Sequence, residues 1–413
     1  MSDKKNITLI STNFYPEDSA IGLYSTQFAE FLISKGYLVT VIAGFPYYPQ
    51  WKINKKYALL PSFYKETFNE IEIFRHKQYV PKKVNFIGRI LLLLSVLYGT
   101  IINSWKVKKS DLVICIIPFT LSCFAGYLLS KRTKSKLWIH IQDFEFDLAF
   151  ESGILKPTNF WTQMIKKSVF KSESFILNKA AVVSSISYTM LNKLKTKSTV
   201  KNIFYFPNWV DAETINPANF RKHNYINPDK FTLLYSGNIG EKQDWNIFEQ
   251  ICSCININDN IEIIIVGSGS YLETLKEKSK KYLFVHFYPL VKYSELSNLL
   301  CSADVHFLFQ KTNVIDSLMP SKLLGMMASE KPSIVTGNKD SEVAKIFEKS
   351  NGGYYFDNDA INTIFETIIL LKNNEKIRIE KGNNAREFVL NQYSENEIFN
   401  SVEQKIQSVF HEK

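Results

Sequence analysis

The sequence predicts an α/β protein made of two domains, each built around a parallel, doubly wound sheet. Its 413 residues exceed what one ordinary hydrophobic core organises. Short β-rich runs alternate with longer helical patterns in both halves, as in proteins whose parallel strands are joined by helices. Between the halves, residues 207–230 are polar and include three prolines, which is typical of a linker. We therefore expect domains over residues 1–210 and 211–390, with residues 391–413 forming a helix that can pack back on the first domain.

The expected strands are short apolar runs that end in polar or glycine-rich loops. In the first half they are NITLISTNF, LVTVIAG, IEIFRHK, DLVICIIP, KLWIHIQD and AAVVSSIS, and in the second FTLLYSGNIG, IEIIIVGSGS, LFVHFYPL, DVHFLFQ, PSIVTG and GGYYFD. The helix after the first strand is expected from about Leu23 to Lys35, with Gly36 ending it. Ligands of open α/β sheets bind beyond the carboxyl ends of the strands, so we expect both sheets to face a central cleft.

Composition limits the classes of partner. The net charge of +10 favours anionic partners such as nucleotide phosphates or anionic lipid. The basic residues are dispersed and no nucleic-acid-reading motif is present, which argues against nucleic acid. The five cysteines lie mostly in apolar runs, as buried thiols in a reducing compartment do. The six histidines show no zinc spacing, and no metal site is expected.

One apolar run, Ile90 to Ile102, spans 13 residues and is too short to cross a bilayer, which takes roughly 20. Basic residues flank it, and Tyr98 and Trp105 are interleaved with it. A helix of this kind can lie in the headgroup layer of an anionic membrane, which predicts peripheral membrane contact near residues 82–109. The alternative is a core helix with charged ends.

A second run, Leu112 to Leu129, has 18 residues and no charge, so its length alone would allow a membrane span. Pro118 divides it into a β-branched stretch and a helical stretch. We therefore expect a buried strand, a turn and a packed helix here instead of a span.

A candidate phosphate cradle lies in IDSLMPSKLLGMMASEKP, residues 315–332. A Pro-Ser-Lys triplet precedes an apolar helical run that ends near Met327. Unpaired backbone N–H groups and the helix dipole make such a helix start suitable for an anion. Lys322 adds a positive charge and Ser321 a hydroxyl. The alternative is an ordinary capped helix.

Glycines mark three further strand ends. Gly22 follows the first strand, at the start of the next helix. In YSGNIGEKQDW, Gly237 and Gly240 form a tight loop, and Lys242 can reach a phosphate. The loop VGSGS, which contains Gly267, lacks the full spacing of a dinucleotide-binding fingerprint and is a weak signal.

Four titratable residues lie in WIHIQDFEFD, at the end of an expected strand. His140, Asp143, Glu145 and Asp147 are expected close together, where a carboxylate could act as a base or bind sugar hydroxyls. The alternative is that Asp143 or Asp147 caps the following helix. The Asp-Asn-Asp sequence at 357–359 looks like a metal-binding motif, but its position after GGYYF favours a turn.

Taken together, the stretches FPYYPQWKI, HIQDFEFDLAFESG, FPNWVD, GNIGEKQDW and MPSKLLGMMAS make the whole chain resemble glycosyltransferase family 4. These are retaining, nucleotide-sugar-dependent enzymes of the GT-B fold, which has two Rossmann-like domains. The similarity is greatest to the branch that builds bacterial exopolysaccharide and O-antigen, including colanic-acid glycosyltransferases and N-acetyl-L-fucosamine transferases.

The resemblance implies roles for particular residues. Lys242 matches the family's diphosphate-binding lysine, and Asn238 stands where that loop usually has an arginine. The family's usual pair of glutamates aligns with Ser317 and Gly325, so both carboxylates are absent, and Ser317, Asp316 or Ser321 could substitute. The implied donor-binding residues are Gly22, Gly237, Asn238, Lys242, Gln243, Gly267, Leu290, Val291, Ser317, Ser321, Lys322 and Leu323. The expected catalytic residues are Asp143, Lys242 and Lys322, and the expected acceptor-side residues are His140, Asp143 and Glu145.

The resemblance implies transfer of a sugar from a nucleoside-diphosphate sugar to an undecaprenyl-diphosphate-linked glycan at the inner face of the cytoplasmic membrane. Because lysines and a helix start can replace a metal ion, we expect the transfer to be metal-independent. The resemblance favours a fucose-type donor, UDP-N-acetyl-L-fucosamine or GDP-fucose. Two alternatives stay open: a non-catalytic nucleotide-sugar-binding protein, which the absent glutamates favour, and an epimerase of GT-B fold.

Overall fold

The computed structural model describes residues 4–18, 20–82, 86–151, 160–211, 213–240, 243–312 and 321–411. The chain forms two compact units. Unit 1 contains residues 1–207 and 401–413, and unit 2 contains residues 208–400. The boundary falls at the first residue of the polar stretch 207–230.

Unit 1 is built on an eight-stranded sheet with the order β3-β4-β2-β1-β5-β6-β7-β8. Every neighbouring pair in it is parallel except β3 with β4. The strands are β1 (Asn6–Ile10), β2 (Leu38–Gly44), β3 (Phe63–Phe68), β4 (Ile71–His76), β5 (Leu112–Ile117), β6 (Lys136–Ile141), β7 (Val182–Ser185) and β8 (Ile203–Tyr205). The helices are α1 (Ala20–Ser34), α2 (Lys55–Ala58), α3 (Phe86–Lys106), α4 (Ser122–Thr133), α5 (Glu145–Glu151), α6 (Phe160–Leu177) and α7 (Tyr188–Lys197).

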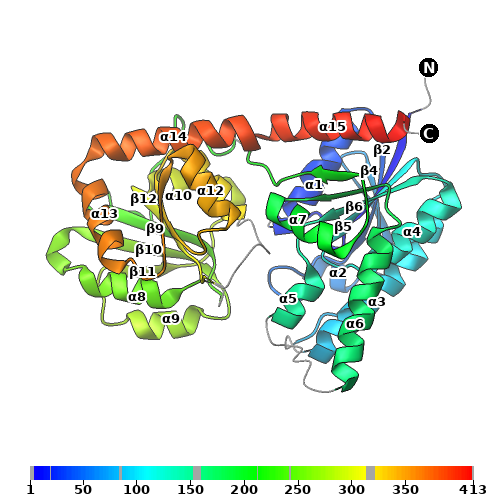
Figure 1. Ribbon diagram of the computed structural model, residues 1–413, viewed down its shortest axis with the longest axis horizontal. Helices are drawn as coiled ribbons and strands as arrows, with labels where there is room; N and C mark the ends of the chain where they lie inside the picture. The colour runs from blue at the N-terminus through cyan, green and yellow to red at the C-terminus, as the bar shows by residue number, and fades with distance from the viewer. Residues whose placement is uncertain are drawn as a thin grey trace. The chain divides into compact units, whose positions relative to one another are not determined.

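Unit 2 is built on a six-stranded, wholly parallel sheet with the order β11-β10-β9-β12-β13-β14. Figure 1 shows the strands of each unit lying side by side between helices. The strands are β9 (Phe231–Asn238), β10 (Ile261–Ser268), β11 (Val285–Tyr288), β12 (Val305–Phe309), β13 (Ser333–Thr336) and β14 (Gly353–Phe356). The helices are α8 (Trp245–Cys254), η1 (Ile257–Asp259), α9 (Leu272–Ser279), α10 (Tyr293–Ser302), α11 (Ser321–Ala328), α12 (Glu342–Ser350), α13 (Ile361–Asn373) and α14 (Glu375–Tyr393). The predicted parallel α/β architecture is confirmed in both units.

The sequence pattern missed the antiparallel edge strand β3. It pairs with β4 through a tight turn at Asn69 and Glu70, whose φ angles are 45° and 65°. Two consecutive positive φ angles match the twist of an antiparallel hairpin. The strand has a partly exposed FYKETF sequence without a buried apolar run, so it lacks the signal that marked the predicted strands. The three-residue edge strand β8 was missed as well.

Helix α1 also differs from its expected bounds, because it begins at Ala20, three residues before Leu23. Its end agrees with expectation. Gly36 has a φ of 86°, and its N–H donates to the carbonyl of Ile33 at 2.8 Å, which satisfies one of the helix's last carbonyls.

The stretch from Leu112 to Leu129 forms β5, a turn and α4, as predicted. Strand β5 is buried along its whole length and pairs with β1 and β6. The apolar run is therefore split between the core of the sheet and a helix that packs on it. All five cysteines are free thiols, and four of them are buried.

Helix α3 is longer than the apolar run that predicted it and spans 21 residues. Over Ile87–Lys106 its length and mean hydropathy of 1.6 would allow it to cross a membrane, and 39% of that window is buried within the protein. One face packs inward through Leu92 and Val96. The other is exposed to solvent, with exposed fractions of 50% at Leu94 and 70% at Trp105.

The last helix is α15 (Glu395–His411), and its residues from Ser401 onward belong to unit 1. Tyr37 donates its hydroxyl to Glu403 at 2.9 Å, and Lys405 donates to the side-chain oxygen of Asn202 at 2.5 Å. Within residues 401–411 the buried apolar side chains are Val402, Ile406 and Val409. Residues 401–411 therefore complete the surface of unit 1.

Candidate functional site

The carboxyl end of β9 and the start of α11 meet at Gly237 and Lys322. Gly237 has a φ of 139°, a conformation that side chains other than glycine's rarely adopt. A Cβ atom at this position would lie 3.3 Å from Nζ of Lys322 and 3.5 Å from its Cε. The absence of a side chain at Gly237 thus lets the lysine stem cross the end of the strand.

Tyr235 holds the ammonium group of Lys322. Nζ donates to the Tyr235 hydroxyl at 2.6 Å and lies 4.2 Å from the centre of its ring. The hydroxyl in turn donates to the carbonyl of Asn238 at 2.5 Å, so its lone pairs face the lysine. The tyrosine is itself buried, with 1% of its side chain exposed. Lys322 is therefore fixed at the end of β9 by a rigid partner.

Burial lowers the pKa of Lys322 to about 7. The ammonium group is only partly hydrated, and no carboxylate forms an ion pair with it among the described residues. An anion that bound beside Nζ would stabilise the charged form and raise this pKa again. The position thus suits the phosphates of a ligand.

The end of β10 lies directly against the same loop. A Cβ atom at Gly267 would lie 2.0 Å from the carbonyl oxygen of Gly237, and one at Gly269 would lie 2.6 Å from the side-chain oxygen of Asn238. Only glycines allow the two strand ends to approach so closely. The weak VGSGS signal therefore marks a real backbone contact beside Lys322.

Gln243 and Trp245 stabilise the loop that follows Asn238. The side-chain oxygen of Gln243 accepts from the backbone N–H of Gly240 at 3.1 Å. The indole N–H of Trp245 donates to the carbonyl of Gly240 at 2.9 Å. Lys242 lies outside the described residues, so its predicted diphosphate contact stays a prediction.

Helix α11 begins at Ser321, as the cradle hypothesis requires. The side chain of Leu323 is fully buried in the core, so a contact with a donor would come from its backbone, and its binding role stays a prediction. Ser317 lies outside the described residues, as does the rest of residues 313–320, and the question of what replaces the glutamate pair stays open there.

Leu290 and Val291 lie in the loop between β11 and α10. Leu290 has 47% of its side chain exposed. Among the described residues, the backbone groups of these two form no hydrogen bond. They are therefore available to hold a nucleobase, as the resemblance implied.

Gly22 lies in the first turn of α1, which agrees with its expected place at the start of the helix. A Cβ atom at Gly22 would lie 2.6 Å from Cβ of Glu17. Glu17 is buried, and one of its carboxylate oxygens accepts from the backbone N–H groups of Tyr47 at 2.7 Å and Tyr48 at 2.8 Å. Gly22 thus admits a carboxylate that ties the loop after β1 to the loop after β2.

The predicted acceptor-side role of His140 is corrected, because its ring lies inside the sheet with 2% exposed. The amide of Gln142 donates to Nε2 at 2.9 Å, so Nδ1 carries the proton and donates to the Ser184 hydroxyl at 3.0 Å. Burial lowers the pKa of His140 to about 3, which keeps the ring neutral. His140 therefore orients Gln142 and does not itself face a ligand.

The carboxylates after β6 have separate roles. Glu145 accepts from the backbone N–H groups of Phe119 at 3.0 Å and Thr120 at 2.9 Å, and burial raises its pKa. Asp147 forms ion pairs with Lys193 at 2.9 Å and Lys197 at 2.6 Å. Both carboxylates are thus engaged in holding neighbouring segments.

The third carboxylate, Asp143, is partly exposed, as Glu145 and Asp147 are. It lies close to the loop after β2, because its charge helps to raise the pKa of Tyr48, after burial and the charge of Glu17. The side chains of Asp143 and Tyr48 therefore line the same part of unit 1.

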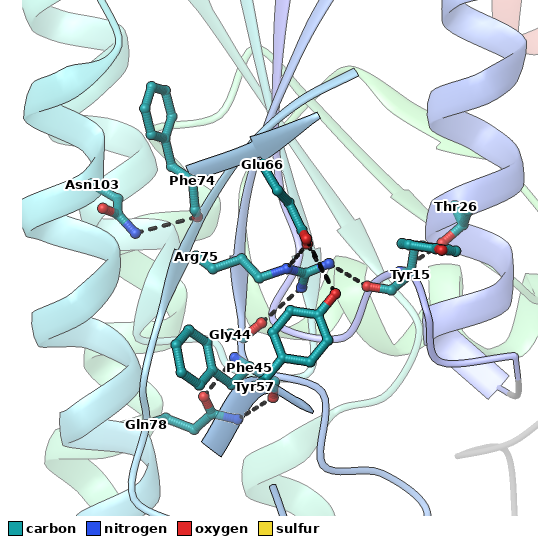
Figure 2. A network of polar contacts seen from close by, with 10 residues as sticks. All are labelled: Tyr15, Thr26, Gly44, Phe45, Tyr57, Glu66, Phe74, Arg75, Gln78 and Asn103. Atoms are coloured by element: carbon teal, nitrogen blue, oxygen red, sulfur yellow. Dashed lines mark hydrogen bonds and ion pairs between the residues drawn. The ribbon is translucent and has the colours of Figure 1, made fainter. Parts of the chain in front are cut away.

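A buried arginine that sequence reasoning missed organises the loops after β1 and β2 (Figure 2). Arg75 is fully buried and forms an ion pair with Glu66. Its other nitrogens donate to the carbonyl of Gly44 at 3.0 Å and to that of Tyr15. Tyr57 donates to the same Glu66 carboxylate at 3.1 Å. One guanidinium group thus joins both loops to the edge strand.

The Asp-Asn-Asp sequence forms the predicted turn. Asp357 pairs with Lys339 at 2.5 Å, and Asn358 donates to Asp244 at 2.9 Å and to the carbonyl of Gln310 at 2.8 Å. In the part of the chain that the structure describes, no group of three His, Cys, Asp or Glu residues is placed to hold a metal ion.

Comparison with known proteins identifies the family. A family model described as glycosyl transferases group 1 matches residues 217–388. WcaI of Escherichia coli (strain K12), which is named as a colanic acid biosynthesis glycosyl transferase, is 30% identical over 360 residues. The match covers 84% of this chain and 86% of WcaI. The chain belongs to the group 1 glycosyl transferases. This glycosyltransferase therefore depends on a nucleotide sugar, as the resemblance predicted.

Solved structures show the GT-B fold for this group 1 glycosyltransferase. Sucrose-phosphate synthase from Thermosynechococcus elongatus superposes with a TM-score of 0.74 at 15% identity, covering 99% of this chain and 100% of that one. HepE of Anabaena, in complex with UDP and glucose, superposes with a TM-score of 0.68 at 12% identity, covering 98% and 100%.

Proposed function

We propose that this glycosyltransferase transfers a hexose, with retention of configuration, from a UDP sugar to a lipid-linked glycan during bacterial surface polysaccharide synthesis. The observation that carries the proposal is Lys322, placed by Tyr235 across Gly237 at the end of β9. HepE, a structural neighbour, binds UDP and UDP-glucose, which supports UDP as the donor nucleotide. WcaI is named for colanic acid biosynthesis, which supports a polysaccharide product. A fucose-type sugar remains our preferred donor.

The chemical task is to stabilise the negative charge that develops on the departing diphosphate. Lys322 would supply a positive charge at that point, and the N–H groups at the start of α11 would add hydrogen bonds. Two such donors can replace a metal ion, so we propose that the reaction is metal-independent. Asp143 would contact the transferred sugar or the acceptor hydroxyl at the unit 1 side.

The proposed acceptor is an undecaprenyl-diphosphate glycan, which resides in the cytoplasmic membrane. Helix α3 supports this, because its exposed apolar side chains lie between clusters of basic residues. Such a surface can enter the headgroup layer of an anionic membrane from the cytoplasmic side. The enzyme would thus bind the membrane peripherally.

The proposed donor class is tested by thermal unfolding with UDP, GDP, dTDP or ADP. We expect UDP to raise the unfolding midpoint, because a ligand at 100 times its Kd stabilises the folded state by about 2.7 kcal/mol. ADP and dTDP should give no shift. A shift with GDP alone would change the donor class, and no shift with any nucleotide would contradict the proposal.

The proposed membrane contact predicts that replacing Leu91 and Leu94 by glutamine weakens binding to phosphatidylglycerol vesicles. These side chains are 44% and 50% exposed in solution. Each would lose roughly 1 kcal/mol of transfer free energy, so binding should fall about 10- to 30-fold in a flotation assay. The matched control is Leu370→Gln on α13, where the exposed fraction is 41%. Equal binding by the control and the double variant would place α3 away from the membrane.

A further inference from the structure

Unit 1 contains three arginines, and two of them have obvious partners. Arg75 joins Glu66 and two backbone carbonyls. Arg132 donates to the carbonyls of Ser104, at 2.7 Å, and Val107, and lies 4.9 Å from the ring of Trp105. Arg89, on α3, differs from both of them.

The guanidinium group of Arg89 has no hydrogen bond or ion pair among the described residues. Its Nε atom is nevertheless buried from solvent. A buried N–H without a partner costs free energy, more so on a charged group, so such atoms in native structures usually mark a missing partner. The planar guanidinium group forms paired hydrogen bonds with carboxylates and phosphates. Arg89 therefore lacks an oxyanion partner, such as a carboxylate or a phosphate.

An acidic group close enough to feel the charge of Arg89, Glu145, does not supply that anion. Arg89 acts electrostatically on Glu145, where its charge opposes the rise in pKa that burial causes. No ion pair within 4.0 Å forms between them in the described structure. One carboxylate oxygen of Glu145 already accepts from the N–H groups of Phe119 and Thr120. The interaction with Glu145 thus places Arg89 near the loops after β5 and β6, but Glu145 does not neutralise the charge of Arg89.

The same helical turns expose a stripe of apolar side chains. Ile87 is 68% exposed and Ile90 37%, and Leu91 and Leu94 continue the same face at the spacing of helical turns. On its other face, α3 packs through Leu92 against a cluster that includes Tyr47 and Phe119, from the loops after β2 and β5. The first turns of α3 therefore place an unpaired guanidinium group between an apolar surface and the acceptor-side loops.

A lipid with a diphosphate group on a long apolar tail would be complementary to this guanidinium group and the apolar surface beside it. We propose that Arg89 binds the diphosphate of the lipid-linked acceptor, while Ile87, Ile90, Leu91 and Leu94 contact the first part of its isoprenoid tail. The inference rests on the proposed function, which names the acceptor class. It assigns Arg89 a binding role that Lys82, exposed just before the same helix, does not share.

The test measures binding of farnesyl diphosphate and of farnesol to the full-length protein in detergent micelles, without donor or turnover. Wild-type protein should bind farnesyl diphosphate at least tenfold more tightly than farnesol. Arg89→Gln should weaken binding of farnesyl diphosphate about tenfold or more and leave farnesol unchanged. Arg89→Lys should lie between them, because an ammonium group keeps the charge but loses the paired geometry. Lys82→Gln, the matched control, should stay within about threefold of wild type.

Several outcomes would overturn the assignment. One is equal binding of farnesyl diphosphate by wild type and Arg89→Gln. Another is an equal fall in Arg89→Gln and Lys82→Gln, which would indicate general attraction to anions. Binding of phosphatidylglycerol vesicles must also be unchanged in Arg89→Gln, since a parallel loss would assign Arg89 to membrane phosphates. If Arg89→Gln fails to fold, Arg89→Lys provides the test instead. Wild-type affinity of Arg89→Lys for farnesyl diphosphate would refute the paired hydrogen bonds. Stabilisation by UDP, measured on the same variants, separates this result from failure of the proposed transferase function.

Discussion

Lys322→Ala is expected to weaken UDP binding about 10- to 100-fold, because a hydrogen bond to a charged group contributes about 1.5–3 kcal/mol. Turnover should fall further, by roughly a hundredfold or more, if the same ammonium group stabilises the departing diphosphate. Binding is measured by calorimetry and turnover by release of UDP. The control is Lys345→Ala, an exposed lysine on α12. Unchanged binding and turnover in Lys322→Ala would remove the lysine from the site.

The same lysine predicts how donor binding depends on pH. Burial lowers the pKa of Lys322 to about 7 in the ligand-free protein, and a bound diphosphate raises it. The lysine is therefore charged in both states below pH 7, and above pH 7 UDP binding takes up a proton. Affinity should fall as the pH rises from 7 to 9, where phosphates with a second pKa of about 6 no longer titrate. In Lys322→Ala this fall should disappear, and in Tyr235→Phe, which lacks the accepting hydroxyl, it should begin at lower pH.

Arg75→Met is expected to destabilise unit 1 by about 3–5 kcal/mol, because it leaves the Glu66 carboxylate without its buried partner. The change also frees the carbonyls of Gly44 and Tyr15. A unit of this size should lose about 2–4 °C in unfolding midpoint for each kcal/mol. We expect calorimetry to show an early transition for unit 1 while unit 2 unfolds as in the wild type.

Two further variants separate the contributions around Arg75. Glu66→Gln keeps a hydrogen-bond acceptor and removes the charge, so it should cost less than Arg75→Met. Combining the two should cost less than their sum, since residues in one network are coupled. A loss below about 1 kcal/mol in Arg75→Met would show that the network contributes little to stability.

The fold could be predicted well because a buried parallel strand is visible in the sequence as a continuous run of apolar residues. The run LVICII has no polar residue to compete with burial, and the structure confirms it as a strand. The edge strand β3 could not be found in this way, since one of its sides is open to solvent. Helix boundaries were less certain because Ala20 and Gly22 do not distinguish a loop from a first helical turn.

Parts of the candidate site could be singled out from backbone geometry or from charge, as at Gly237 and Lys322. Gly237 and Gly267 could be singled out as loop glycines, and the structure adds what they approach. His140 could not be assigned correctly, because a histidine at a strand end looks the same whether it faces a ligand or the sheet interior. Tyr235 and Arg75 carried no signal, since each lies in a strand and finds its partners on distant segments.

The placement of residues 401–413 in unit 1 has a consequence for how the protein is made. Unit 2 is an insertion between two parts of unit 1, so the segment that closes unit 1 is synthesised after unit 2. At about 5–20 residues per second, unit 1 waits roughly 10–40 s for the helix that covers Tyr37 and Asn202. During that interval the nascent chain carries an uncovered apolar surface where Val402, Ile406 and Val409 will pack. Unit 2 can complete its folding before unit 1, which reverses the usual order in which the N-terminal domain folds first. We expect chaperones to bind mainly to the incomplete unit 1.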